Sequence, residues 1–382
     1  MPYLPPCVDA GTSSKEKEMT TNVTPERSRS ARSLTPPTGS GPVFTQQTGG
    51  WNWRKLTHRP ESGALVGTVL VFVFFAIFGG TQFLSTGGTA SWLNIAAELA
   101  IIALPVGLLM ISGEFDLSVG SVVAASSVTL ALVSGQGGAP MFVGIIAAIA
   151  VGALVGFVNG FIVTRTNVPS FIVTLAMQFA LAGLTLGIAR LLTGSTNIPV
   201  TADPISKALF GTLIAGQFEV AIFWALGIAI VIAWILQMTP WGNWIFAVGG
   251  DTQSARASGI PVGKVKIGLF MGTGVGAAIV GVIQTMLYNG AQTGTGQSFV
   301  FNSVIAVVVG GVLLTGGYGS VIGVMLGCLT FAIVNQGIYY TGWNSDWASL
   351  ILGILLLAAV LMNNTFRKLA LSSGANKTRK AA

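Results

Sequence analysis

Long apolar runs alternate with short polar connections along most of the chain. Counting stretches near the ~20 residues that cross a bilayer predicts about ten membrane spans. Their approximate bounds are 64–80, 92–112, 118–134, 140–164, 170–192, 219–238, 265–288, 300–315, 320–341 and 345–362. The third and eighth are the shortest. The pattern therefore predicts an all-α fold, a polytopic membrane helix bundle.

The basic residues give this bundle an orientation, because cytoplasmic loops of membrane proteins are enriched in Lys and Arg. With the N-terminus placed inside, the outer side keeps only Arg190 and Lys207. The inner side collects Arg54, Lys55, Arg59, Arg165, Arg256, Lys264, Lys266, Arg367, Lys368, Lys377, Arg379 and Lys380. This asymmetry predicts an even number of spans and two cytoplasmic termini. The net charge of +7 is then mainly a topology signal and indicates no nucleic-acid partner.

Composition supports the same class. Of 382 residues, 52% are hydrophobic and 8% charged, whereas soluble domains run about 25% charged. The 51 glycines include helical-spacing runs that predict smooth packing faces. These are Gly152-x3-Gly156-x3-Gly160, Gly183-x3-Gly187 and Gly319-x3-Gly323-x3-Gly327. We expect three regions: a disordered cytoplasmic tail (1–60), a transmembrane domain (61–363) and a basic cytoplasmic tail (364–382).

Several kinds of chemistry are excluded. His58 is the only histidine, so the chain has no His-based metal site and no Ser-His catalytic pair. Cys7 and Cys328 lie far apart in a polar tail and an apolar run, and form no plausible disulfide framework. We expect no catalytic residue, no metal and no cofactor bound by this chain.

The octapeptide Gly113–Gly120 places two carboxylates, Glu114 and Asp116, between two long apolar runs. A charge at membrane depth is costly unless it faces a polar cavity or a partner, which favours a functional role. The alternative is a turn at the water interface, with both acids solvated and Asp116 or Ser118 capping the next helix. Both interpretations fit the sequence.

Two connections are long. Residues 193–218 form an outer loop, and residues 239–264 form the principal inner loop. Within the inner loop, Asp251 to Ser258 predicts a two-turn helix, because Asp251 suits the helix dipole and Gly259 with Pro261 ends it. Such a helix is either a docking element for a partner or a simple amphipathic surface helix.

Polar side chains within the spans are candidates for a substrate path, although intramembrane amides more often bond between helices. The candidates are Asn94, Glu98, Asn159, Asn302 and Asn335. Glu98 stands out, because an acid one turn into the second span must face something polar.

Three segments resemble one family, the permease subunits of bacterial ABC importers for ribose and related monosaccharides. They are Gly113-Glu114-Phe115-Asp116-Leu117-Ser118-Val119-Gly120-Ser121; Ala247-Val248-Gly249-Gly250 through Ala255-Arg256-Ala257-Ser258-Gly259-Ile260; and Gly294-Thr295-Gly296 through Ala306-Val307-Val308-Val309-Gly310-Gly311 to Gly316-Gly317-Tyr318-Gly319-Ser320-Val321-Ile322-Gly323. They occur in the family's order, and the resemblance covers roughly residues 60–362.

The resemblance implies half of a homodimeric pore in the bacterial inner membrane, surrounded by lipid. It also implies an ATPase subunit below, which binds ATP and Mg, and an extracytoplasmic sugar-binding protein above. It implies a gate in the first segment, carried by Asp116, Leu117, Ser118 and Gly120, with Glu114 in place of a small residue. It implies an ATPase-coupling helix formed by Gly250, Asp251, Gln253, Ala255, Arg256, Gly259 and Ile260. Thr252-Gln253-Ser254 departs from the family's acidic, alanine-rich turn, so contact would depend more on Arg256 and Ile260.

The chain is not expected to hydrolyse ATP, because the nearest match to the Gly-x4-Gly-Lys-Ser/Thr motif, Gly259 to Val265, has the wrong spacing and no hydroxyl for Mg²⁺. The expected function is import of a monosaccharide or polyol, such as ribose, xylose or inositol, by alternating access. The alternative is a proton-coupled secondary transporter that uses Glu98, Glu114 and Asp116. ABC permeases are not themselves enzymes, and neither alternative assigns this chain an enzymatic activity.

Overall fold

The computed structural model describes residues 60–166, 168–344, 346–347, 349–351, 353–354 and 357. Seven helices of this part are long and apolar enough to cross a membrane. They are α4 (Thr86–Ile111), α5 (Val119–Leu130) continued by the π-helix η1 (Ala131–Gln136), α6 (Met141–Arg165), α7 (Ser170–Thr193), α9 (Ala221–Met238), α12 (Val262–Tyr288) and α14 (Val321–Tyr340). The predicted helical membrane class is confirmed. Most of the tail 1–60, the tail 364–382 and much of the predicted span 345–362 lie outside the described residues.

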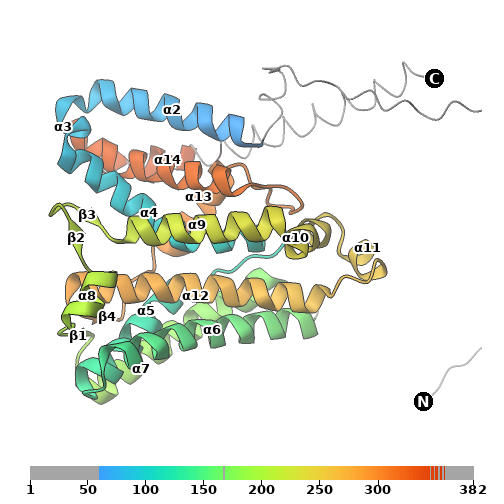
Figure 1. Ribbon diagram of the computed structural model, residues 1–382, viewed down its shortest axis with the longest axis horizontal. Helices are drawn as coiled ribbons and strands as arrows, with labels where there is room; N and C mark the ends of the chain where they lie inside the picture. Colours follow the sequence, from blue (N-terminus) through green and yellow to red (C-terminus); the bar gives the residue numbers. More distant parts are fainter. Residues whose placement is uncertain are drawn as a thin grey trace, which may run out of the picture. The chain divides into compact units, whose positions relative to one another are not determined.

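The remaining elements are one further long helix, Pro60–Phe78, which packs against α14, and shorter helices and strands. They are α2 (Pro60–Phe78), α3 (Gly80–Leu84), α8 (Pro204–Phe210), α10 (Pro240–Gly250), α11 (Thr252–Ala257), α13 (Phe299–Val309), β1 (Asn197–Pro199), β2 (Leu213–Ile214), β3 (Phe218–Glu219) and β4 (Gly290–Gln292). Strand β1 pairs antiparallel with β4, and β2 pairs antiparallel with β3. The strands and α8 lie at one end of the bundle, and α10 and α11 lie at the other (Figure 1).

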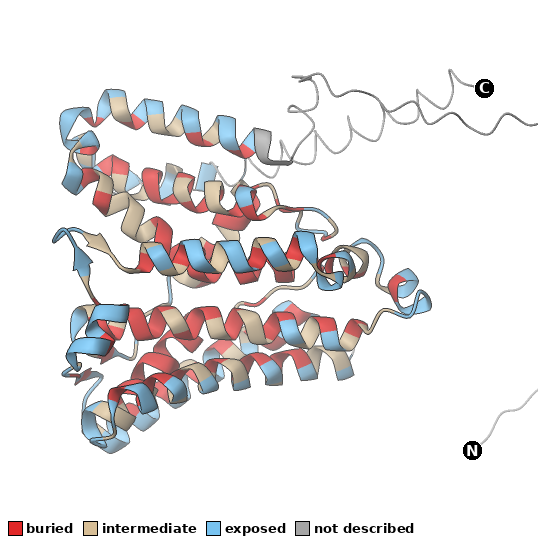
Figure 2. Cartoon of the chain, viewed as in Figure 1, coloured by how far each residue is buried: buried red, intermediate tan, exposed pale blue. Residues whose placement is uncertain are grey.

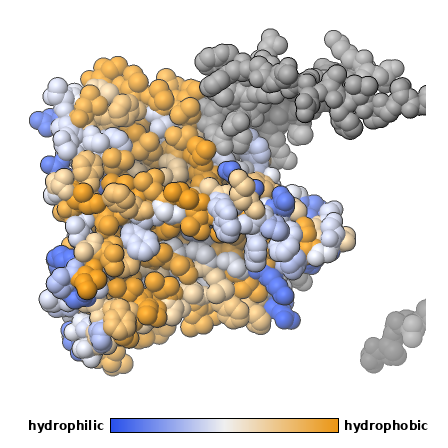
Figure 3. Space-filling model, in the orientation of Figure 1, coloured by the Kyte–Doolittle hydropathy of each residue, from blue (hydrophilic) through white to orange (hydrophobic). Residues whose placement is uncertain are grey.

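Helix α4 forms the centre of the bundle. It is buried at every position from Ala96 to Ile111 and packs against α9, α12, α13 and α14. By contrast, α6, α7 and α9 alternate buried with exposed residues (Figure 2). Their exposed positions include large apolar side chains, namely Phe142, Leu154, Phe179, Leu191, Phe223 and Ile230. Hydrophobic atoms cover much of the side of the bundle, as expected for a surface in contact with lipid or a second membrane subunit (Figure 3).

The predicted span over 300–315 is wrong in length. Helix α13 ends at Val309 after 11 residues, about 16 Å at 1.5 Å per residue, or roughly half of a bilayer core. The chain then continues as a loop in which Gly311, Gly316 and Gly317 take positive φ angles. Apolar residues continue past the helix end, and Val312 is fully buried in the loop. The hydropathy pattern therefore overestimated the length of this helix.

The glycine runs differ in what they pack against. A Cβ at Gly156 would lie 2.2 Å from the carbonyl oxygen of Phe270, and one at Gly152 would lie 2.3 Å from that of Gly274. These contacts bring α6 directly against the backbone of α12, as predicted for a small-residue face. Gly183 and Gly187 face open space, so the packing role predicted for them is wrong within this chain.

We expect Gly156→Val to separate α6 from α12 and to lower the melting temperature of the purified protein strongly. Overpacking of a core costs about 1–3 kcal/mol, and the contacted atoms at Gly156 are backbone, which cannot rotate away. The matched control is Gly67→Val on α2, where nothing lies within 4 Å. Equal melting temperatures of the two variants in detergent would contradict this account of the α6–α12 contact.

Candidate functional site

Residues 113–118, here named the motif loop, connect α4 to α5 and hold a buried acid. Asp116 is 1% exposed. Its Oδ1 accepts hydrogen bonds from the backbone N–H of Ser118 (2.9 Å) and from the Ser118 hydroxyl (2.6 Å). Its Oδ2 accepts a hydrogen bond from the hydroxyl of Thr273 on α12. The interpretation of the loop as a turn with a solvated Asp116 is therefore wrong.

Burial raises the pKa of Asp116, and the hydrogen bonds from Ser118 and Thr273 act in the opposite direction. Ser118 is the N-cap residue of α5 but makes no side-chain cap. Instead its hydroxyl also accepts a hydrogen bond from the Asn159 amide on α6, at 2.8 Å. The Asn159 Oδ1 is buried with no partner in the described part of the chain. Asn159, predicted as a substrate contact, thus belongs to the network that holds the motif loop.

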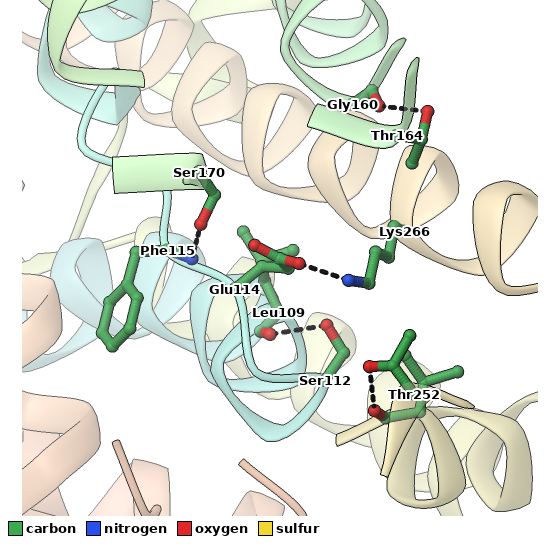
Figure 4. A network of polar contacts seen from close by, with 10 residues as sticks. Leu109, Ser112, Glu114, Phe115, Gly160, Thr164, Ser170, Thr252 and Lys266 are labelled. Atoms are coloured by element: carbon green, nitrogen blue, oxygen red, sulfur yellow. Dashed lines mark hydrogen bonds and ion pairs between the residues drawn. The ribbon is translucent and has the colours of Figure 1, made fainter. Parts of the chain in front are cut away.

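The backbone of the motif loop is held by a third helix, α7. The N–H of Phe115 donates to the hydroxyl of Ser170 at 3.1 Å (Figure 4). The N–H of Leu117 donates to the hydroxyl of Thr174, also at 3.1 Å. These bonds satisfy backbone donors that a buried loop would otherwise leave unpaired. The loop is therefore bonded to α6 through Ser118, to α7 through its backbone, and to α12 through Asp116.

Glu114 forms an ion pair with Lys266 at the first turns of α12 (Figure 4). Both side chains are 13% exposed. The sequence did not indicate this pair, because the two residues are far apart in the chain and Glu114 replaces a small residue of the family pattern. The only sequence signal for the pair was that an acid, Glu114, and a base, Lys266, were both predicted at the cytoplasmic ends of spans. The pair joins the motif loop to α12 a second time.

We expect Glu114→Gln and Lys266→Met each to weaken the link between α12 and the motif loop. Removing one partner leaves a half-buried charge unpaired, and solvent at this depth limits the cost to about 1–2 kcal/mol. The measurement is the amount of substrate transported per ATP hydrolysed in the assembled transport complex. The exchange Glu114→Lys with Lys266→Glu should restore much of the wild-type ratio. If the exchanged pair behaves like the worse single variant, the attraction between the two charges is not what matters.

Glycines bring all three family-like segments together around the motif loop. At its start, a Cβ on Gly249 of α10 would lie 1.8 Å from the Ile111 carbonyl, and the Gly317 N–H donates to that same carbonyl at 2.8 Å. At its end, a Cβ on Gly120 would lie 2.7 Å from the carbonyl of Gly296. Segments that are more than 130 positions apart therefore meet in one buried region.

The predicted helix in the inner loop exists as α11. Asp251 caps it, because the Asp251 Oδ1 accepts from the N–H of Ser254 at 2.6 Å. These bonds from Ser254 lower the pKa of Asp251, so it is ionised at neutral pH. At the other end, Gly259 has a φ of +81° and its N–H bonds to the Arg256 carbonyl at 3.0 Å. A left-handed glycine of this kind ends a helix and reverses the chain.

The surface of α11 points away from the bundle (Figure 1). Gly250, Asp251, Gln253, Arg256 and Gly259 are exposed, and Ala255 is buried. Ile260, for which we expected a strong partner contact, is half-buried and packs against the hydrophobic core. The exposed face therefore depends on Gln253 and Arg256 more than on Ile260. Sequence analysis missed α10, the helix before α11, since its residues read as part of one loop.

The remaining predicted path residues do not form one cluster. Asn94 bonds through both amide atoms to the β2–β3 hairpin, at Gln217 and Glu219. Glu98 is buried and accepts a hydrogen bond from Gln284 of α12 at 2.8 Å. Asn302 on α13 and Asn335 on α14 are half-buried, and no hydrogen bond among the described residues joins them to Glu98.

Comparisons with known proteins give consistent results. The family described as "Branched-chain amino acid transport system / permease component" matches residues 88–360. The fructose import permease protein of Rhizobium meliloti is 30% identical over 83% of this chain and 90% of its own length. The ribose import permease protein of Escherichia coli K12 is 33% identical over 69% of this chain and 82% of its own length. The galactose/methyl galactoside import permease protein of the same strain is 31% identical over 81% of this chain and 95% of its own length.

Proposed function

This chain belongs to the branched-chain amino acid transport system permease component family, and from that premise we propose that it carries a monosaccharide or polyol across the bacterial inner membrane. The resemblance to monosaccharide ABC importer permeases is confirmed by the family and by relatives that import ribose, fructose and galactose. Membership in this family also confirms a permease subunit, in which ATP hydrolysis belongs to a separate subunit, rather than an enzyme. The sugars for which these relatives are named share a small polyhydroxylated ring.

The observation that carries the proposed mechanism is the position of α11. It is short, capped at both ends and exposed. Of its two neighbours, α10 contacts the Ile111 carbonyl just before the motif loop through Gly249, and α12 contacts the loop itself through Lys266 and Thr273. A force applied to α11 by a partner would therefore move both flanks of that loop as a rigid body. We assign the docking role to α11 and the gating role to the motif loop.

The proposed assembly has an ATPase subunit at the α11 end and an extracytoplasmic sugar-binding protein at the strand end. Arg165, Arg256, Lys264 and Lys266 lie on elements that reach the α11 end, whereas Arg190 and Lys207 lie on elements that reach the strand end. This division supports cytoplasmic placement of α11 and of both termini, with about ten spans. ATP and Mg would be bound by the partner subunit, and this chain would bind no cofactor.

A second copy of this chain is the proposed partner within the membrane. Helices α6, α7 and α9 expose large apolar side chains that no other part of the described bundle covers. A second copy could cover part of this surface. The open small-residue positions Gly183 and Gly187 on α7 would allow another helix to approach closely.

The test is uptake into proteoliposomes that contain this chain, its ATPase subunit and, outside, its binding protein. Labelled D-ribose, D-fructose and D-galactose are offered with ATP trapped inside. We expect uptake of at least one of them that needs ATP and is abolished by vanadate. Uptake that is insensitive to vanadate and is abolished by a proton ionophore would contradict the proposal, since a secondary transporter is driven by the proton gradient.

A further inference from the structure

Two acidic side chains meet at the outer half of the bundle. Glu98 lies on α4 and Glu219 lies on β3, within electrostatic range of each other. Asn94, one helical turn before Glu98, fixes this arrangement: its Oδ1 accepts from the N–H of Glu219 at 3.0 Å, and its amide donates to the Gln217 carbonyl at 2.9 Å. Positions four apart share a helix face. The hairpin that carries Glu219 is therefore bonded to the face of α4 that carries Glu98.

Helix α12 supplies the other side of this cluster. Gln284 donates from its Nε2 to the Glu98 Oε2 at 2.8 Å. Tyr288, one turn further along the same face of α12, lies within electrostatic range of both Glu98 and Glu219. The Tyr288 side chain is 68% exposed, so the cluster reaches from the interior to the outer surface. We name Glu98, Glu219, Gln284 and Tyr288 the outer acidic cluster.

Each acid of the outer acidic cluster keeps one oxygen unpaired. Glu98 is 9% exposed, and its Oε1 is buried with no hydrogen-bond partner among the described residues. The Oε2 of Glu219 is buried and likewise unpartnered in that part of the chain. Buried unpaired acceptors are costly and rare, and an unpaired acid within a membrane span marks a functional site by default. The bond from Gln284 orients the Glu98 carboxyl group, and the bond from the Glu219 N–H to Asn94 holds the backbone of Glu219. Neither bond uses the two unpaired oxygens.

We propose that the outer acidic cluster is a hydroxyl-binding subsite, at which the free oxygens of Glu98 and Glu219 accept hydrogen bonds from a polyhydroxylated substrate entering from the outer side. This inference rests on the proposed function. The cluster joins α4, β3 and α12, which belong to different parts of the chain. Binding of a substrate there would therefore change the contacts of α12. That helix also contacts the motif loop through Thr273 and Lys266.

The chemistry of the cluster favours hydroxyl donors over a metal ion. No group of three or more His, Cys, Asp or Glu side chains that could hold a metal occurs among the described residues. A carboxyl group has two oxygens that can accept hydrogen bonds from hydroxyls, and it keeps acceptor capacity when it is protonated. A ring with several hydroxyls matches two acids that lie within electrostatic range of each other and each have a buried oxygen without a partner among the described residues.

The test measures uptake in proteoliposomes by the full complex with wild-type chain, Glu98→Gln and Glu219→Gln. The substrate is whichever of D-ribose, D-fructose and D-galactose the wild type transports, together with each of its single-deoxy analogues that the binding protein delivers. The matched control is Asp346→Asn, which makes the same change at an exposed residue. Assembly with the ATPase subunit and basal ATP hydrolysis are measured in parallel, so that failure to fold is recognised.

We expect Glu98→Gln and Glu219→Gln to lower uptake of the intact sugar about tenfold or more, because the substrate loses a hydrogen bond to a carboxyl group. For one deoxy analogue the same substitution should cost much less, because the hydroxyl that bonded the acid is already absent. An equal loss for every analogue, or no loss, would overturn the subsite. An equal loss combined with a shifted pH dependence would overturn it in favour of a proton site. Absence of any wild-type uptake would instead contradict the proposed function.

Discussion

Replacing Asp116 with Leu is expected to reduce ATP-driven uptake by at least about tenfold in a protein that still inserts and assembles. Leucine fills the space but removes both acceptors, which leaves the hydroxyls of Ser118 and Thr273 buried without this partner. Each unpaired buried group costs about 1–3 kcal/mol. The motif loop would lose one of its two side-chain links to α12 and keep only the ion pair between Glu114 and Lys266, so a movement of α12 would set the position of the loop less firmly.

The conservative change Asp116→Asn separates this role from general folding. Asparagine keeps an oxygen that can accept from the N–H and the hydroxyl of Ser118, and its amide can bond the Thr273 oxygen. We therefore expect Asp116→Asn to retain a large part of the uptake, with Asp116→Leu far below it. Detergent-stable assembly with the ATPase subunit is confirmed first for both. Full uptake by an assembled Asp116→Leu protein would refute the gating role.

The double change Arg256→Glu with Gly259→Leu is expected to abolish substrate-stimulated ATP hydrolysis. Arg256 is an exposed cation on α11 that could bond carboxylates or helix-end carbonyls of the ATPase subunit. Gly259 has a φ of +81°, a conformation that costs an L-residue roughly 1–2 kcal/mol. Leucine would therefore distort the end of α11, while the reversed charge would repel any carboxylate of the ATPase subunit that the proposed docking pairs with Arg256.

The measurement is ATPase activity of the assembled complex, with and without loaded binding protein. The control for charge is Arg190→Glu, which reverses an exposed cation at the strand end of the bundle and should leave stimulation intact. Unchanged assembly and unchanged stimulation in the Arg256/Gly259 variant would show that α11 is not the coupling element. Loss of stimulation in the Arg190 variant as well would mean that charge reversal anywhere disturbs the complex.

The sequence predicted the membrane class and the short helix α11 correctly, because both depend on local patterns. Apolar runs and a helix with Asp251 at its start and Gly259 after its end can be recognised without tertiary contacts. The prediction of a full span over 300–315 was wrong because the apolar pattern there reflects tertiary packing and not a continuous helix. Val312 is apolar because it is buried among other helices, and a hydropathy pattern does not distinguish such a loop from a helix.

The site was less predictable than the fold. Asp116 was predicted as a site residue, but its hydrogen bond with Thr273 was not, because that bond depends on how α12 packs beside the motif loop. The same holds for the ion pair between Glu114 and Lys266, which are 152 positions apart. Glu219 was not predicted as a site residue at all, because only the bond from its N–H to Asn94 places it near Glu98. Contacts of this kind follow from packing and leave no periodic signal.

The most direct test of the account is site-directed cross-linking of α11 to the ATPase subunit. Gln253→Cys places an exposed thiol on α11, and Ala215→Cys places one on the hairpin at the opposite end, both with Cys7 replaced by Ser. The reagent is a short bifunctional maleimide applied to the assembled complex. We predict a cross-link to the ATPase subunit from position 253, changed in yield by ATP with vanadate, and none from position 215. An active complex in which position 253 never cross-links, or in which position 215 does, would contradict the account.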